Sequence, residues 1–273
     1  MFLNKINKIN IFAILLTFFS ILYFYNLFLI YQNFYSLNTS GLLLINYDGG
    51  FLRRALLGEI ITSLSLLLTI EVKKVFILFY IINYLIFFYL NYLFFKKLKQ
   101  NYIFYFFIFS PIFLTFPLSD VSSKYAEFLI QRESFLICFF LVFCYFCKSL
   151  NDRRLVYAIG LIISIFLTFL YELTILCYPF FFFAYYIFLK RKKLNINFFE
   201  LIFAVIILMF IIFLHIHLYG NNNFEIVIKN LNTNFGFNFS KDNFIFSWLN
   251  KDVGEQITYL LPDFKSSYIF KYI

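Results

Sequence analysis

The chain has 273 residues, 63% of them hydrophobic, and its mean hydropathy of +0.83 excludes a soluble globular protein. Its formal net charge is +9, but the basic residues form short clusters between apolar runs and do not follow one amphipathic face. Such clusters are typical of orientation signals in membrane proteins and argue against nucleic-acid binding. The composition therefore predicts an all-α, polytopic membrane helix bundle.

If every basic cluster faces the cytoplasm, the apolar runs predict about seven membrane crossings. They lie at residues 9–31, 75–95, 101–118, 125–147, 155–171, 173–189 and 198–218. An odd number of crossings puts the amino terminus in the cytoplasm and the carboxy terminus outside. We therefore expect a multi-pass cell-membrane protein with a transmembrane domain at 1–218, an outer loop at 32–74 and a short non-cytoplasmic tail at 219–273.

Residues 55–70 predict an interfacial helix in the first outer loop and not a further crossing. At about 1.5 Å per residue this segment reaches roughly 24 Å, which is less than the ~30 Å hydrocarbon core. Apolar side chains share one helical face, at Leu57, Ile60, Ile61, Leu64, Leu67 and Leu68. Polar side chains take the opposite face, at Glu59, Thr62, Ser63 and Thr69. A helix lying in the outer leaflet fits this pattern.

The stretch from Tyr47 to Arg54, with sequence YDGGFLRR, follows the first crossing directly. Two interpretations of its Asp48 stand side by side. In one, Asp48 closes a turn with the glycine pair or caps the next helix. In the other, Asp48 accepts a proton while Arg53 and Arg54 bind a phosphate through their planar guanidinium groups.

A second charged patch covers residues 120–133. On a continuous helix, one stripe would hold Asp120, Lys124, Glu127 and Gln131. The apolar run that follows is too short for a crossing, so the crossing must begin earlier and carry Arg132 and Glu133 below the membrane surface. Ionisable groups at that depth usually face a cavity or a partner. An ion pair that only joins helices is the alternative.

Glu172 is the third charged element. The apolar stretch 155–189 lies between two basic clusters and predicts a helical hairpin with its apex at Tyr171 and Glu172. Each arm spans roughly 26 Å, which leaves the apex at or just beneath the outer interface. Cationic partners on that side are Arg53, Arg54, Lys124 and Arg132. A structural salt bridge and a substrate contact both fit this position.

No metal site is indicated by the remaining candidate ligands. Cys144 and Cys147 have C-x-x-C spacing, but no second ligand pair accompanies them, and the sequence predicts lipid-facing or packed thiols. His215 and His217 diverge by about 200° on a helix and so cannot share a metal unless the helix ends before them. The cofactor is unknown, and a divalent metal remains open. The tail is too short and irregular to predict an independent catalytic domain.

Three separate elements thus bring charge to the outer end of the bundle: the first loop, the start of the fourth crossing and the hairpin apex. This layout resembles the GT-C-type glycosyltransferases, polytopic enzymes that pass a sugar from a polyprenyl-phosphate carrier to a non-cytoplasmic acceptor. In that family an acid in the first outer loop is the catalytic base, and Asp48 occupies that place. The stretch from Asp48 to Gly58 also resembles one in little-characterised bacterial polytopic proteins, and the whole resemblance covers roughly residues 1–190.

The resemblance implies a membrane glycosyltransferase with Asp48 as catalytic base and a lipid-linked sugar donor as partner. Its implied substrate-binding residues are Arg53, Arg54, Lys124, Glu127, Arg132, Glu133 and Glu172. Membrane lipids are the other expected partners, nucleic acid is not expected, and protein partners are unknown. The alternatives are a transporter or flippase for an anionic lipid-linked substrate, or a polysaccharide polymerase or ligase. The sequence shows no inverted repeat of the kind that many transporters contain.

Overall fold

The computed structural model describes residues 8–48, 55–96, 127–171, 177–195, 198–217 and 224–239. Within these ranges the chain forms helices and no strand, which confirms the predicted all-α class. The predicted crossing at 101–118 lies outside the described residues.

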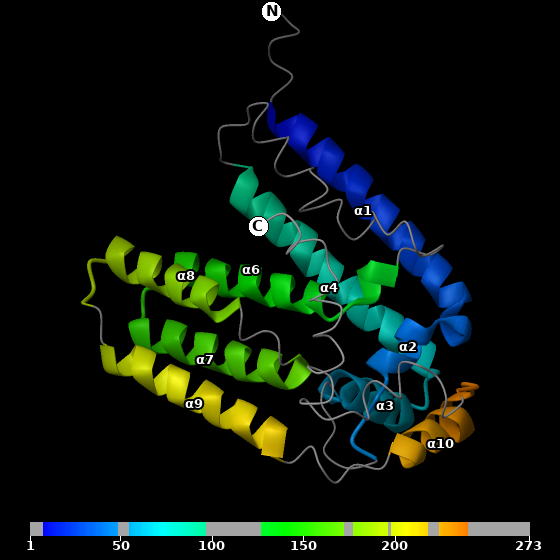
Figure 1. Ribbon diagram of the computed structural model, residues 1–273. Helices are drawn as coiled ribbons and strands as arrows, with labels where there is room; N and C mark the ends of the chain where they lie inside the picture. Colours follow the sequence, from blue (N-terminus) through cyan, green and yellow to red (C-terminus); the bar gives the residue numbers. More distant parts are fainter. Residues whose placement is uncertain are drawn as a thin grey trace, which may run out of the picture.

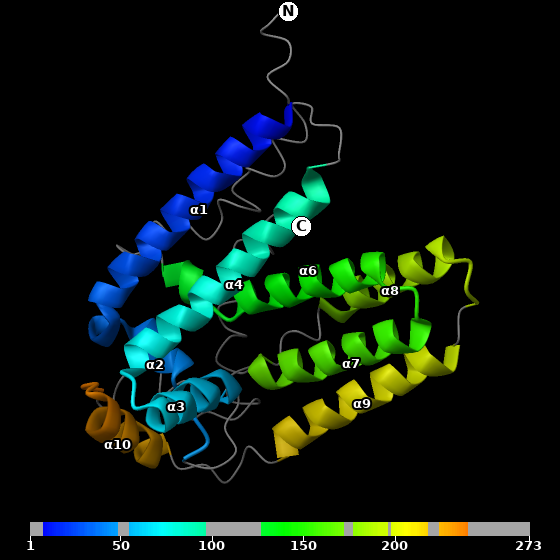
Figure 2. The ribbon, with the colours of Figure 1, turned by 180° about the vertical axis from the view of Figure 1, so that it is seen from behind.

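The long helices form two groups inclined to one another (Figures 1 and 2). The first group is the antiparallel pair α1 (Lys8–Gln32) and α4 (Val72–Phe95). The second comprises α6 (Glu133–Ser149), α7 (Arg153–Leu170), α8 (Tyr178–Arg191) and α9 (Phe198–His217). Packing of α4 on α6 joins the groups. Three shorter helices gather where α1 ends and α4 begins: α2 (Asn38–Leu43), α3 (Leu56–Leu68) and α10 (Phe224–Phe235).

Three helices among the described residues are long and apolar enough to cross a membrane: Ile11–Gln32, Val72–Phe95 and Arg153–Leu170. They coincide with the first, second and fifth predicted crossings. By contrast, α6 has 17 residues and α8 has 14. At about 1.5 Å per residue both are shorter than a ~30 Å hydrocarbon core.

Helix α3 forms where the interfacial helix was expected, but it buries a different face. Its buried residues are Leu57, Gly58, Ile61, Thr62 and Ser65. Leu67 and Leu68, which belonged to the predicted apolar face, are exposed. Gly58 and the small polar side chains form the face that packs closely on the protein, and Thr62 satisfies its hydroxyl by donating to the Gly58 carbonyl at 2.8 Å.

The predicted continuous helix over 125–147 is wrong at its start. Residues Glu127–Ile130 form a 3₁₀ turn, η4, and the chain bends before α6 begins at Glu133. Two tyrosine hydroxyls of α4 explain the break: Tyr84 donates to the Leu129 carbonyl at 2.5 Å and Tyr80 donates to the Ile130 carbonyl at 2.6 Å. These carbonyls therefore need no helical amide donor. Glu127 and Gln131 consequently do not share one α-helical stripe.

Helix α8 also begins later than the predicted 173. The hairpin's first arm ends at Leu170 as expected, and Tyr171 is extended. The second arm starts at Tyr178 because Pro179 lies in its first turn, where a missing amide hydrogen costs nothing. Sequence reasoning overlooked this proline.

Residues 44–48 cross α3 at Gly58, where the two backbones almost touch. An ideal Cβ on Gly58 would lie 2.0 Å from the Ile45 carbonyl oxygen and 2.6 Å from the Leu44 carbonyl carbon. Real Cβ atoms do not approach backbone atoms so closely, so only glycine permits this crossing. This close contact places Tyr47 and Asp48 beside the first turn of α3.

We expect Gly58→Ala to lower the free energy of unfolding by about 1–3 kcal/mol, because the added methyl group forces the backbone at Ile45 away from α3. Thermal unfolding of the purified protein in detergent measures the effect. Leu67→Ala on the same helix is the control, since Leu67 is 78% exposed and its replacement should leave the transition almost unchanged. Equal stability of Gly58→Ala and wild type would contradict the crossing.

Candidate functional site

The backbone of the first loop is tied to α3 by Glu59. The Tyr47 amide donates to Glu59 Oε2 at 3.0 Å, and the Ser63 hydroxyl donates to Glu59 Oε1 at 3.0 Å. Burial, and then the nearby Glu59 carboxylate, raise the pKa of Tyr47 to about 12, so its phenol stays neutral at physiological pH. Sequence reasoning placed Glu59 only on a polar face and missed its role in holding this loop.

Asp48 is exposed at the end of residues 44–48, the segment that passes over α3. Two uncharged side-chain amides hold its carboxylate. The Asn46 side chain donates to Asp48 Oδ2 at 2.6 Å, and the Asn230 side chain donates to the same oxygen at 3.1 Å. The Asp48 amide in turn donates to Asn46 Oδ1 at 3.3 Å. Among the described residues, Oδ1 of Asp48 receives no hydrogen bond.

Asn230 belongs to α10, which comes from the predicted irregular tail and docks on the first loop. Gly236 ends α10 in the left-handed conformation, at a φ of 75°. Phe237 then packs against Phe34 and Tyr35, with ring centroids 5.6 and 5.2 Å apart. The sequence signal for this helix was the apolar pattern Val227, Ile228 and Leu231, all of which are buried.

A pair of reciprocal hydrogen bonds fixes the turn after α10. The Asn232 side chain donates to the Phe239 carbonyl at 2.9 Å and accepts from the Phe239 amide at 2.9 Å. The Phe239 ring stacks on Phe237 and lies against Gly41 of α2. The carboxy-terminal segment up to Phe239 is therefore part of the candidate site, which extends the prediction made from the first loop alone.

The second charged patch lies below this loop, beside α4. Arg132 is 9% exposed and Glu133 is half-buried. Both residues follow η4 closely, and the Ile130 carbonyl of η4 accepts from Tyr80, which lies about 12 Å along α4 from its first residue, Val72. The Asn83 side chain donates to the Ser134 hydroxyl at 3.3 Å. The structure thus places Arg132 and Glu133 beside α4, and their depth below the membrane surface stays a prediction.

The elements that carry the two charged patches pack against each other, but no ion pair joins Asp48 to Arg132 in the described part of the chain. The 3₁₀ turn η4 packs on both α1 and α2, directly before the segment that carries Asp48. Among the described residues, however, the polar partners of Asp48 are Asn46 and Asn230, and Arg132 is not one of them. The side chain of Glu127 and the whole of Arg53, Arg54, Lys124 and Glu172 lie outside the described residues, so their expected roles stay predictions.

Among the described residues no group of three or more His, Cys, Asp or Glu side chains could hold a metal. The four cysteines are free thiols, and the Cys138 thiol donates to the Asn83 carbonyl at 3.4 Å. This agrees with the expectation of packed thiols. The side chains of His215 and His217 lie outside the description.

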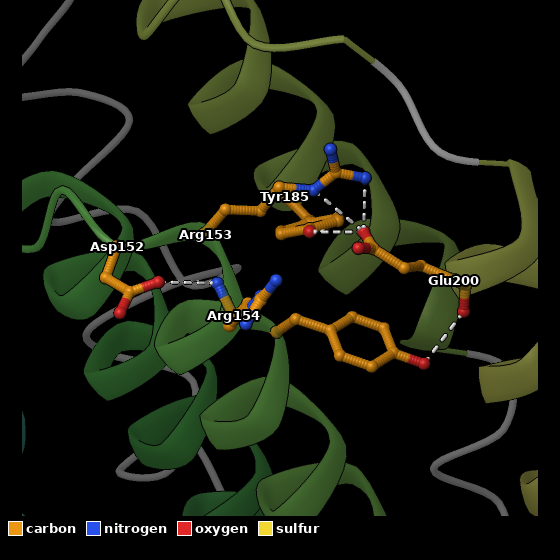
Figure 3. A network of polar contacts seen from close by, with 6 residues as sticks. Asp152, Arg153, Arg154, Tyr185 and Glu200 are labelled. Atoms are coloured by element: carbon orange, nitrogen blue, oxygen red, sulfur yellow. Dashed lines mark hydrogen bonds and ion pairs between the residues drawn. The ribbon is translucent and has the colours of Figure 1, made fainter.

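Sequence reasoning missed a second polar cluster, which lies where α7 and α9 begin and near the end of α8 (Figure 3). Arg153 approaches Glu200 Oε2 through Nη2 at 2.8 Å and Nε at 3.1 Å. The Tyr185 hydroxyl donates to the same oxygen at 2.8 Å, and the Tyr157 hydroxyl donates to the Glu200 carbonyl at 2.9 Å. One carboxylate thus connects three helices.

Asp152 and Glu200 are the two acidic residues that the basic clusters of the sequence would place on the cytoplasmic side. Asp152 caps α7 by accepting from the Arg154 amide at 2.8 Å (Figure 3). Glu200 pairs with Arg153. Both carboxylates therefore have structural partners. The sequence signal for the ion pair was Glu200, a lone acid at the start of an apolar run beside basic clusters.

No family model, curated protein or solved structure matches the chain. The resemblance to GT-C-type glycosyltransferases accordingly rests on the layout and the short motif of the sequence alone, and it stays a prediction.

We expect Glu200→Gln to lower the free energy of unfolding by about 1–3 kcal/mol, because Arg153 would lose its ionic partner in a half-buried position. Arg153→Met combined with Glu200→Gln should cost less than the sum of the two single changes, since neither charge is then left behind. A double-mutant cycle in detergent, followed by thermal unfolding, measures this coupling. Strictly additive losses would show that the pair contributes nothing.

Proposed function

We propose that this chain is a membrane glycosyltransferase that moves a sugar from a polyprenyl-phosphate donor to an acceptor on the non-cytoplasmic face. The observation that carries the proposal is the state of Asp48. Its carboxylate is exposed, two neutral amides hold it through Oδ2, and Oδ1 receives no hydrogen bond from the described residues. A fixed carboxylate with an available oxygen is suited to accept a proton.

In the proposed reaction, Asp48 Oδ1 takes the proton of an acceptor hydroxyl while the acceptor oxygen attacks the anomeric carbon of the donor sugar. The bond between that carbon and the phosphate oxygen breaks, and its electron pair leaves with the polyprenyl phosphate. Arg53 and Arg54 follow Asp48 closely in sequence and are the candidates to stabilise the departing phosphate. Donor contacts by Lys124, Glu127, Arg132, Glu133 and Glu172 remain part of the proposal.

The proposal includes seven crossings with α3 at the outer interface. Support comes from the ends of the helices: Asp48, α3 and α10 gather where α1 ends, whereas Lys148, Arg153 and Arg191 lie at the far ends of α6, α7 and α8. Docking of α10 on the first loop also requires these two segments to lie on the same side of the membrane. That requirement agrees with an odd number of crossings before the tail.

We expect reporter insertions at Asn151 and Asn222 to appear on opposite sides of the membrane, with Asn151 in the cytoplasm. Paired reporters, one active only in the cytoplasm and one only outside, distinguish the two sides. An insertion after Asn38, in the first outer loop, should give the same result as Asn222. The topology is wrong if Asn151 and Asn222 report the same side.

We expect Asp48→Asn to reduce sugar transfer by about 10²–10⁴-fold while folding is preserved. An asparagine at this position keeps an oxygen that can accept from the Asn46 and Asn230 amides but loses the proton acceptor. The assay uses the full chain in proteoliposomes with synthetic polyprenyl-phosphate-linked glucose, mannose and arabinose, and follows donor consumption. Glu225→Gln, which removes another exposed carboxylate from α10, is the matched control and should retain activity.

Asn230→Ala should lower kcat in the same assay more than it changes KM, because Asp48 keeps its chemistry but loses one of its two anchors.

The same assay also distinguishes the alternative functions. A transporter or flippase would move lipid-linked substrate across the bilayer without consuming it, and a polymerase or ligase would transfer a preassembled glycan. Full activity of the Asp48→Asn protein on a donor that wild type consumes would overturn the proposed base.

A further inference from the structure

An open apolar groove lies outside the Asp48 site, between the ends of α1 and α3 and the first turns of α4. Its volume is about 420 Å³, and its walls include Tyr31, Leu68, Lys74 and Leu78. The groove follows α4 from Lys74 to Ile81, a distance of about 10 Å along the helix axis. Apart from Tyr31 and Lys74, its lining consists of aliphatic and phenylalanine side chains.

Charge is concentrated at one end of this groove. Lys74 lies at its rim and Lys73 lies beside it, with the Lys73 ammonium 5.2 Å from the Tyr31 ring centroid and 5.7 Å from that of Tyr35. Glu71 lies 3.4 Å from the Lys73 ammonium and 3.6 Å from that of Lys74. Two ammonium groups share one carboxylate, which leaves the end of the groove with a net positive charge.

The wall contributed by α3 is held in place by its connection to α4. Thr69 ends α3 in the left-handed conformation, and Ser65 donates to the Ile70 carbonyl at 2.6 Å while its own carbonyl accepts from the Ile70 amide at 3.1 Å. Leu64 and Leu68 form this wall, and Leu68 is more than half exposed, as are the neighbouring Leu66 and Leu67, which do not line the groove. Leucines exposed in this number beside a helix of spanning length indicate contact with hydrocarbon.

We infer that the groove binds one anionic phospholipid, with an acyl chain along α4 and the phosphate at Lys74 and Lys73. The order of the chemistry along the helix matches the order within the lipid: cations at the end of a spanning helix and an apolar channel directly below them. Lysine ammonium groups at a membrane interface attract anionic headgroups. The inference is independent of the proposed glycosyl transfer, because Asp48 and Asn230 do not line the groove.

The test is native mass spectrometry of the full chain, titrated with phosphatidylglycerol or with phosphatidylcholine of the same acyl chains. Wild type should retain one phosphatidylglycerol in preference to phosphatidylcholine. The double variant Lys73→Gln with Lys74→Gln should weaken phosphatidylglycerol binding on the order of tenfold, down to the level of phosphatidylcholine. Leu78→Trp should fill the groove and weaken both lipids.

Two matched controls lie on the same helix. Leu85 is seven residues beyond Leu78, faces the same direction and has nearly the same exposure, 54% against 53%, but does not line the groove. The Lys96 ammonium at the far end of α4 lies 4.9 Å from the Tyr92 ring centroid. This resembles the placement of the Lys73 ammonium, 5.2 Å from the Tyr31 ring centroid. Leu85→Trp and Lys96→Gln should leave phosphatidylglycerol binding unchanged, as should Asp48→Asn.

The inference is overturned if the groove variants bind phosphatidylglycerol like wild type, or if the controls lose binding equally. It is also overturned if wild type binds polyprenyl phosphate in preference to phosphatidylglycerol and the Lys73→Gln, Lys74→Gln variant loses that preference, since the lysines would then serve the sugar carrier. Loss of glycosyl transfer in Asp48→Asn with intact lipid binding separates this site from the proposed function. Circular dichroism of each variant confirms that the helices are formed.

Discussion

The close approach of residues 44–48 to α3 is the constraint on which the first loop depends. Gly58 leaves room for the Ile45 backbone, and the Tyr47 amide then reaches Glu59 one helical residue later. Asp48 follows immediately and therefore emerges at a defined point above α3. A side chain at position 58 would move this whole segment, and with it the distance between Asp48 and the amide of Asn230.

A second constraint comes from the backbone itself. Carbonyl groups in an apolar bundle need hydrogen-bond donors from the protein, because the surrounding hydrocarbon offers none. At the break before α6 the donors are the hydroxyls of Tyr80 and Tyr84. They allow a non-helical segment at this depth, and that segment sets the position of Arg132 beside α4.

Apolar runs and basic clusters predicted the long helices closely: α1, α4 and α7 end within three residues of the expected crossings. Such patterns depend only on nearby sequence. The break at Leu129 and Ile130 was not predictable in this way, because its donors come from another helix, whereas Pro179 was a local signal for the start of α8 that could have been used. The position of Asp48 in the first loop was predictable, but its partner Asn230 and the pairing of Arg153 with Glu200 are tertiary contacts.

The contact between Asp48 and Asn230 joins residues 182 positions apart. Closing so long a loop has an entropic cost that grows only slowly with length, but the contact cannot form until the last part of the chain has been synthesised. The first loop can meet α4 and α3 early, while α10 arrives after every helix of the bundle. The carboxylate of Asp48 thus gains its second anchor only after α10 has been made, so a chain that lacks α10 would insert into the membrane with this acidic group held, among the described residues, by Asn46.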